Sequence, residues 1–122
     1  MAYLHEFKHI DGHHLIIAPK STIKNWKNEF TKWAPFLRIA ELNPKKEFRD
    51  ETINSLILTK KFDVCITSYE GLTICFAALN KIHWQYFVID EGHKLKNKDS
   101  QISMFCRKIK ARNRMLLTGT PL

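Results

Sequence analysis

Two short polar strings contain the residue types that could perform chemistry in this chain. Residues 90–93 read Asp-Glu-Gly-His, and residues 116–121 read Leu-Leu-Thr-Gly-Thr-Pro. Asp90 offers a carboxylate of the kind that holds Mg²⁺, and Glu91 offers a second carboxylate that could act as a base. Thr118 and Thr120 add two hydroxyls in the second string. Together these groups are typical of a site that hydrolyses a phosphate bond.

The elements that must position these strings follow from an alternation along the chain. Short apolar runs alternate with stretches in which apolar residues recur at helical spacing, and this predicts an α/β fold with a parallel sheet flanked by helices. The length of 122 residues bounds the chain to one domain or part of one. The expected strands are residues 15–18, 37–42, 62–66, 84–89 and 115–117.

Four polar clusters each follow a predicted strand. In a parallel sheet the loops that follow the strands share the carboxyl edge, and open α/β sheets bind their ligands there. Loops are polar anyway, so one such cluster would mean little. An acidic pair opposite hydroxyl and basic loops is more specific and predicts a ligand site at this edge. The clusters are residues 19–21, 67–69, 90–91 and 118–120.

Capping residues and apolar stripes predict the helices between the strands. Ser21 or Thr22 is the expected N-cap of the first helix, and Pro44 is expected at the first position of the next. Thr67 is the expected cap of a third helix, with Glu70 reaching back to form a capping box. The expected inward-facing residues are Ile23, Trp26, Phe30, Trp33, Phe48, Thr52, Leu56, Ile57, Leu72, Cys75, Phe76, Leu79, Ile102, Cys106 and Ile109.

The charge balance of the chain is strongly basic, with 20 Lys and Arg against 12 Asp and Glu, a net charge of +8. This surplus favours a polyanionic partner such as nucleic acid, although a merely basic, soluble surface would give the same number. The three cysteines have no metal-binding spacing and are expected to be reduced and buried. No run approaches membrane-spanning length and no secretory signal is evident, so we expect no membrane contact and a location in the cytosol or nucleus.

The polar strings and two further segments resemble the motifs of a known enzyme family. Residues 90–93 resemble motif II, the Walker B element, of the superfamily 2 helicase-like ATPases, and residues 116–121 resemble motif III. Residues 18–22, Ala-Pro-Lys-Ser-Thr, resemble motif Ia, and residues 66–70, Ile-Thr-Ser-Tyr-Glu, resemble motif Ib. Over nearly the whole chain, the order and wording of these segments are similar to the SWI/SNF family of chromatin-remodelling ATPases.

The resemblance implies roles for the residues of motifs II and III. Asp90 would help to hold Mg²⁺ on the phosphates of ATP, and Glu91 would orient the attacking water. His93, Thr118 and Thr120 would link the nucleotide site to the loops that contact nucleic acid. For His93, simple bracing of its loop is an equal alternative.

The resemblance also implies a fold and partners. Residues 1–122 would be the later part of a RecA-like first lobe that contains motifs Ia, Ib, II and III. In an intact family member, ATP hydrolysis would be coupled to movement of double-stranded DNA or nucleosomes in the nucleus, with subunits of a remodelling complex as further partners. Residues 19–22 and 113–114 favour the imitation-switch branch, whereas Gly92 is more typical of the founding branch.

The expected DNA contacts lie at two helix starts. Lys20 offers a cation, and the start at Ser21 and Thr22 offers backbone amides and the positive end of a helix dipole, which suit a phosphate group. The start at Thr67 and Ser68 offers a second grip of this kind. These hydroxyls could equally be plain N-caps, and the two roles are compatible because a helix start has several donors.

The main departure from the family pattern is the phosphate-binding loop of motif I. That loop needs Gly-x-x-x-x-Gly-Lys-Ser/Thr, and none of the four glycines is followed by lysine. Motif I and the second lobe are thus absent from residues 1–122. We therefore expect this chain alone to hydrolyse ATP negligibly, which leaves a non-catalytic, basic DNA-binding or interfering fragment as an alternative.

A remote alternative is a zinc hydrolase. His5, Glu6 and His9 match the His-Glu-x-x-His signature, which would place both histidines on one helix face with the glutamate as base. His13 or His14 could be a third ligand. A turn pair directly after this segment breaks the helix, so coincidence is the stronger interpretation.

Overall fold

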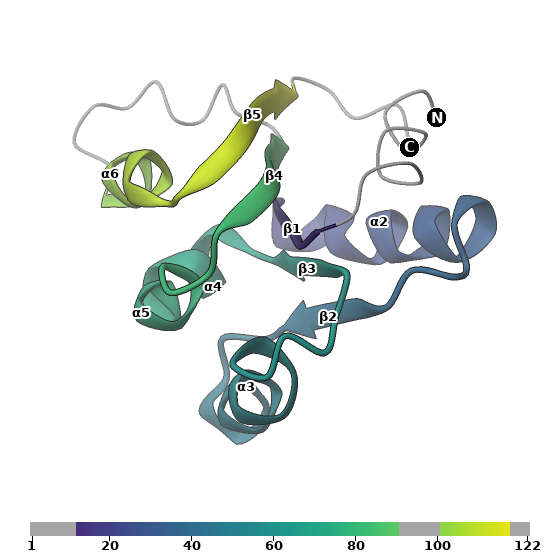
Figure 1. Cartoon of the computed structure of the whole chain (residues 1–122), viewed down its shortest axis with the longest axis horizontal. Coiled ribbons are helices and arrows are strands. Elements are labelled where there is room, and N and C mark those ends of the chain that lie inside the picture. Colours follow the sequence, from purple (N-terminus) through teal and green to yellow (C-terminus); the bar gives the residue numbers. More distant parts are fainter. Residues whose placement is uncertain (1–11, 91–100, 118–122) are drawn as a thin grey trace.

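Five parallel strands form the centre of the protein. The computed structural model describes residues 12–90 and 101–117, and its strands form one five-stranded sheet in the order β2-β3-β1-β4-β5 (Figure 1). Every pairing in this sheet is parallel, which confirms the predicted fold class. The strands are β1 (His14–Ile17), β2 (Ile39–Leu42), β3 (Val64–Thr67), β4 (Trp84–Asp90) and β5 (Ala111–Leu117).

Helices cover both faces of this sheet (Figure 1). One face packs against α2, and the other packs against the helices that follow it in the chain. Among the described helices, none is long and apolar enough to cross a membrane. The helices are α2 (Lys20–Trp33), α3 (Lys46–Thr52), which continues into the π-helical turn η1 (Ile53–Ile57), α4 (Tyr69–Ile74), α5 (Phe76–Leu79) and α6 (Gln101–Lys108).

The alternation of side chains along the central strand divides the core into two clusters. Leu15 and Ile17 of β1 belong to the cluster covered by α4, α5 and α6, whereas Ile16 packs with Trp26 and Phe30 of α2. Because helices cover both faces, every residue of β1 is buried. This double coverage explains why three successive residues of the strand, Leu15 to Ile17, are apolar.

Several predictions about the first two helices are wrong. Trp33 is the last residue of α2 and is 43% exposed, and Phe48 of α3 is 52% exposed. The buried position that anchors this part of the chain is Ile57, one turn beyond α3. Pro44 precedes α3, which begins at Lys46, because the Asn43 side chain first makes a turn by accepting a hydrogen bond from the Lys45 amide at 2.9 Å.

The start of α4 lies one residue later than predicted. Ser68 is the cap, and its Oγ accepts a hydrogen bond from the Gly71 amide at 3.0 Å. Thr67 is instead the last residue of β3. It pairs with Leu42 of β2, so the strand extends one residue further than predicted. The third residue after the cap is therefore Gly71 and not Glu70, so no capping box forms.

The three cysteines are buried and form no disulfide, which confirms the prediction for all of them. Burial raises the pKa of the Cys106 thiol to about 11, and it also raises the pKa of Cys75. Their thiolate forms are therefore disfavoured at neutral pH. Cys106 and Ile109 face the core as predicted, while the side chain of Ile102 lies outside the described residues.

Candidate functional site

The carboxyl edge of the sheet brings together loops that are far apart in the sequence. Ile17 at the end of β1 is in register with Thr67 of β3 on one side and with Ile89 of β4 on the other. The loops that follow these three neighbouring strands therefore begin side by side. Lys20 follows β1 and Asp90 is the last residue of β4. Both therefore lie at the carboxyl edge, in agreement with the clustering predicted there.

Asp90 ends β4 and is completely buried. Its Oδ2 accepts a hydrogen bond from the indole Nε1–H of Trp26 at 2.9 Å, and the Thr22 hydroxyl lies 3.5 Å from the same oxygen. The Tyr69 hydroxyl donates to the main-chain carbonyl of Asp90. The end of β4 is thus held by α2 through the side chain and by α4 through the main chain.

The first turn of α2 differs from the prediction. The helix already begins at Lys20, with Pro19 in the capping position and no side-chain cap. The Thr22 hydroxyl donates to the Pro19 carbonyl at 2.9 Å, so Thr22 is inside the helix. Lys20 and Ser21 are exposed, whereas Thr22 is half-buried and faces Asp90. A ligand in solvent could therefore reach the first two of these three residues.

A groove of about 610 Å³ runs along this edge. Lys20 and Ser68, both predicted as DNA contacts, line it together with Tyr69, which belongs to the predicted cluster 67–69, and Lys45, which no sequence pattern singled out. Lys45 follows β2 by three residues, as Lys20 follows β1 by three residues, so the same edge rule could have found it. Thr67 does not line the groove, because it is buried and its hydroxyl donates to the Leu42 carbonyl at 2.7 Å.

The charge of this groove is mixed. Glu41 and Glu70 line it beside the two lysines. Glu41 forms an exposed ion pair with Lys27 of α2 at 2.6 Å, so part of its charge is compensated. A phosphate group would meet cations at two of the loops and carboxylates between them, which makes Lys20 and Lys45 the side chains that matter for an anionic ligand.

Only part of the predicted catalytic set can be placed. Asp90 is described, whereas Glu91, His93, Thr118 and Thr120 lie outside the described residues. Mg²⁺ usually takes one or two carboxylates together with substrate phosphates and water, so the Asp90 carboxylate fits that ion in its chemistry. Within residues 12–90 and 101–117, no three His, Cys, Asp or Glu side chains are grouped to hold a metal ion.

The zinc signature at His5, Glu6 and His9 also lies outside the described residues. The two candidates for a third zinc ligand are described. His13 Nδ1 lies 2.9 Å from the Phe62 carbonyl, and His14 is buried within β1. Both imidazoles are thus built into the beginning of the sheet.

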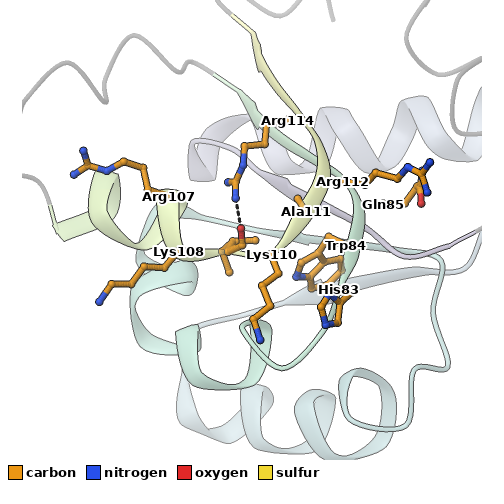
Figure 2. Close-up of a pocket in the computed structure, with 10 residues that line it drawn as sticks. His83, Trp84, Gln85, Arg107, Lys108, Lys110, Ala111, Arg112 and Arg114 are labelled. Carbon is orange, nitrogen blue, oxygen red and sulfur yellow. Dashed lines mark hydrogen bonds between the residues drawn. The ribbon is translucent and has the colours of Figure 1, made fainter.

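A second pocket, of about 600 Å³, lies at the opposite edge of the sheet, where β4 and β5 begin (Figure 2). Its lining is rich in cations, which lie close together in the sequence between residues 107 and 114. Figure 2 shows four of these side chains fanning outward around the pocket. They form no ion pair with any carboxylate of the described residues. We call this group the basic rim, and it consists of Arg107, Lys108, Lys110 and Arg112.

Arg114 also lines this pocket but has a structural role. Figure 2 shows its side chain turned in toward the end of α6. Its guanidinium donates to the Cys106 carbonyl at 2.6 Å and to the Ile109 carbonyl, and it lies 5.8 Å from the centre of the Phe87 ring. Arg114 thereby caps the carboxyl end of α6 and fixes that helix to β5.

Known proteins are similar to this chain over its whole length. Residues 1–122 match the SNF2-related domain. The chain is 43% identical over 122 residues to the SWI/SNF-related matrix-associated actin-dependent regulator of chromatin subfamily A member 1 of Mus musculus. It is 45% identical over 122 residues to the ISWI chromatin-remodeling complex ATPase ISW2 of Saccharomyces cerevisiae. These matches cover 100% of this chain and 12% and 11% of the two proteins, so the chain spans a small part of their length.

The fold is also similar to a solved structure, the Sulfolobus solfataricus SWI2/SNF2 ATPase core in complex with dsDNA. The TM-score is 0.78 at 32% sequence identity, and the match covers 98% of this chain and 24% of that chain. The five-stranded parallel sheet with its flanking helices therefore corresponds to part of a RecA-like ATPase core.

Proposed function

The chain belongs to the SNF2-related domain family, and we propose that it forms the later part of the first lobe of an ATPase that moves along double-stranded DNA and remodels nucleosomes. One observation carries this proposal: the carboxylate of Asp90, in motif II, is hydrogen-bonded to the helix that motif Ia begins. A DNA-dependent ATPase needs contact between the segment that binds DNA and the segment that acts on ATP. The similarity to an ATPase core solved with dsDNA supports the same assignment.

The catalytic roles in this proposal fall on the two carboxylates of motif II. Asp90 would hold Mg²⁺, which would neutralise charge on the phosphates of ATP. Glu91 would orient the water that attacks the terminal phosphate. His93, Thr118 and Thr120 would pass hydrogen-bond changes from the nucleotide site to the DNA-binding loops.

The DNA contacts in this proposal fall on the groove at the carboxyl edge. Lys20 and Ser68 would contact phosphate groups from the groove, and Lys45 would add a second cation there. The exposed Ser21 would contact phosphate from beside the groove. Thr22 and Thr67 would support these contacts without touching DNA, because both hydroxyls face the interior. Contacts of this kind bind the DNA backbone and carry no base sequence.

The proposed setting is the nucleus. Both relatives are named as parts of chromatin regulation, and the yeast relative is named as the ATPase of a remodelling complex. We propose the same setting for this chain, with nucleosomes and the subunits of such a complex as its partners.

A binding experiment tests the DNA contact. We expect the 122-residue chain to raise the fluorescence anisotropy of a labelled 20-base-pair duplex, with an affinity that falls steeply as salt is added, because bound cations release counterions from DNA. Substitution of Lys20→Ala should weaken binding and reduce the slope of log affinity against log salt by about 1.

Lys32→Ala is the matched control, because it removes the same charge from the other end of α2. It should leave the affinity nearly unchanged. Binding that is independent of salt, or an equal loss in both variants, would contradict the proposed DNA contact at the carboxyl edge.

A second candidate function is DNA binding without catalysis. The observation that favours it is the complete burial of Asp90, whose Oδ2 is already engaged by Trp26. An assay of DNA-stimulated phosphate release separates the two functions. Turnover by the chain that is lost in the Asp90→Asn variant would support catalysis by these 122 residues themselves. DNA binding without measurable turnover is the result expected of residues 1–122, because they contain no motif I.

A further inference from the structure

We propose that Trp26 is a positioning residue, which holds the Asp90 carboxylate and transmits to it the position of the DNA-binding start of α2. This inference rests on the proposed function, because it assigns the means by which DNA at the carboxyl edge reaches the motif II carboxylate. It concerns a side chain that lines neither groove and touches no proposed ligand.

The hydrogen bond between Trp26 and Asp90 is the basis of the inference. The two residues are 64 positions apart in the sequence, both are 0% exposed, and their donor and acceptor atoms are 2.9 Å apart. An indole N–H can only donate, and a buried carboxylate needs donors, so each group satisfies a requirement of the other. A hydrogen bond to an ionised acceptor is also stronger than one between neutral groups, which favours a single orientation of the carboxylate.

Two neighbouring contacts show that Asp90 is held from two helices. Thr22 lies four residues before Trp26, so both face the same side of α2 and both approach Oδ2. Tyr69, the first residue of α4, holds the main-chain carbonyl of Asp90. The position of the Asp90 side chain is therefore fixed by contacts with α2, and the position of its main chain is fixed by a contact with α4.

The geometry of α2 explains how a DNA contact reaches the carboxylate. Lys20 is the first residue of this 14-residue helix and lines the groove, while Trp26 lies within the same helix and faces the core. A regular helix moves as a unit, so a phosphate that pulls on Lys20 also displaces the indole of Trp26 relative to β4. The displacement changes the length or angle of the bond to Oδ2.

Trp84 provides an internal comparison. It is also buried, at 1% exposure, and its indole Nε1–H donates to the Leu79 carbonyl at 3.0 Å. This bond joins the beginning of β4 to the end of α5, away from the carboxyl edge. Trp84 also lines the pocket of the basic rim, so its signal should respond to unfolding or to DNA at the amino edge, but not to DNA at the carboxyl edge.

Nuclear magnetic resonance of the 122-residue chain with ¹⁵N-labelled tryptophan tests the inference. The chain has three tryptophans and hence three indole N–H signals. Trp33→Phe and Trp84→Phe variants each remove one signal, so the signal of Trp26 is identified by elimination without disturbing its own bond. We expect the Asp90→Asn substitution to shift the Trp26 indole proton upfield, because the charged acceptor is lost, while the Trp84 signal stays in place.

The DNA arm uses the unmutated chain and the 20-base-pair duplex. Addition of DNA should shift the Trp26 indole signal more than the Trp84 signal, and the shift of the Trp26 signal should be lost in the Lys20→Ala variant. If anisotropy shows that DNA binds but the Trp26 signal does not move, the positioning role is overturned while the proposed DNA contact stands. If DNA does not bind at all, both the proposed function and this inference are overturned.

Discussion

At the scale of single residues, Gly71 is required by its neighbours and not by its backbone conformation. A Cβ atom at this position would lie 1.8 Å from Oγ1 of Thr67. That hydroxyl cannot easily move aside, because it donates to the Leu42 carbonyl and so ties the end of β3 to the end of β2. The close approach also places the Gly71 amide against the Ser68 hydroxyl that caps α4.

We predict that Gly71→Ala destabilises the chain by about 1–3 kcal/mol, the usual cost of overpacking a buried site. Urea denaturation followed by circular dichroism measures this change. Combining it with Thr67→Ala, which removes the clashing hydroxyl, should cost less than the sum of the two single substitutions. Additive losses in the double variant would show that the clash with Thr67 is not the cause.

At the scale of elements, the turn between η1 and β3 contains a residue in an unusual backbone conformation. Lys60 has a φ of 59°, and its amide donates to the Ile57 carbonyl at the end of η1. Left-handed backbone of this kind reverses the chain after a helix, and it disfavours any residue with a Cβ. Lysine is thus the less stable choice at a position suited to glycine.

We predict that Lys60→Gly stabilises the protein by about 0.5–1 kcal/mol, because relief of the left-handed strain exceeds the added entropy of the unfolded chain. Thermal melting measures the difference. Lys61→Gly is the control. Lys61 is the exposed neighbour of Lys60 and has no left-handed conformation, so this substitution should lower the stability of the protein. A lower melting temperature for Lys60→Gly would contradict the prediction.

At the scale of the whole molecule, the two edges of the sheet carry different surfaces. The carboxyl edge holds a groove with both signs of charge, whereas the amino edge holds the basic rim around its pocket. Lys110 and Arg112 lie beyond the last residue of α6, in the loop and in β5. Their proximity to Arg107 and Lys108 without an acidic partner among the described residues should cost stability through repulsion.

We predict that the double substitution of Lys110→Gln and Arg112→Gln raises stability by about 0.5 kcal/mol at low salt, and that the gain shrinks as salt screens the repulsion. Thermal melts between low and high ionic strength measure this. Lys27→Gln is the control of opposite sign, because Lys27 is paired with Glu41 at 2.6 Å. A gain that does not depend on salt would indicate a cause other than charge.

The sequence by itself was sufficient for the architecture. The approximate strand positions, the parallel pairing and the burial of all three cysteines follow from apolar periodicity, a local property that burial on both faces of a sheet imposes directly. The order of the strands across the sheet was not predicted, and β5 begins four residues earlier than expected. The motif residues were recognisable because a motif consists of residue types in a fixed order, which is also a local property of the sequence. The order of strands and loops in the sequence is therefore enough to place Lys20, Ser68 and Asp90 at one edge of the sheet.

Tertiary structure decided which neighbours each of these residues has. Thr67 and Ser68 are both good caps for α4. Ser68 is the cap because Thr67 still pairs with β2 as part of β3. Trp33 and Trp26 share one helical stripe, yet only Trp26 lies over the sheet and reaches Asp90. The Trp26–Asp90 bond joins residues that are 64 positions apart in the sequence, and no local pattern contains such a contact, because it arises only when the strands pack in their final order.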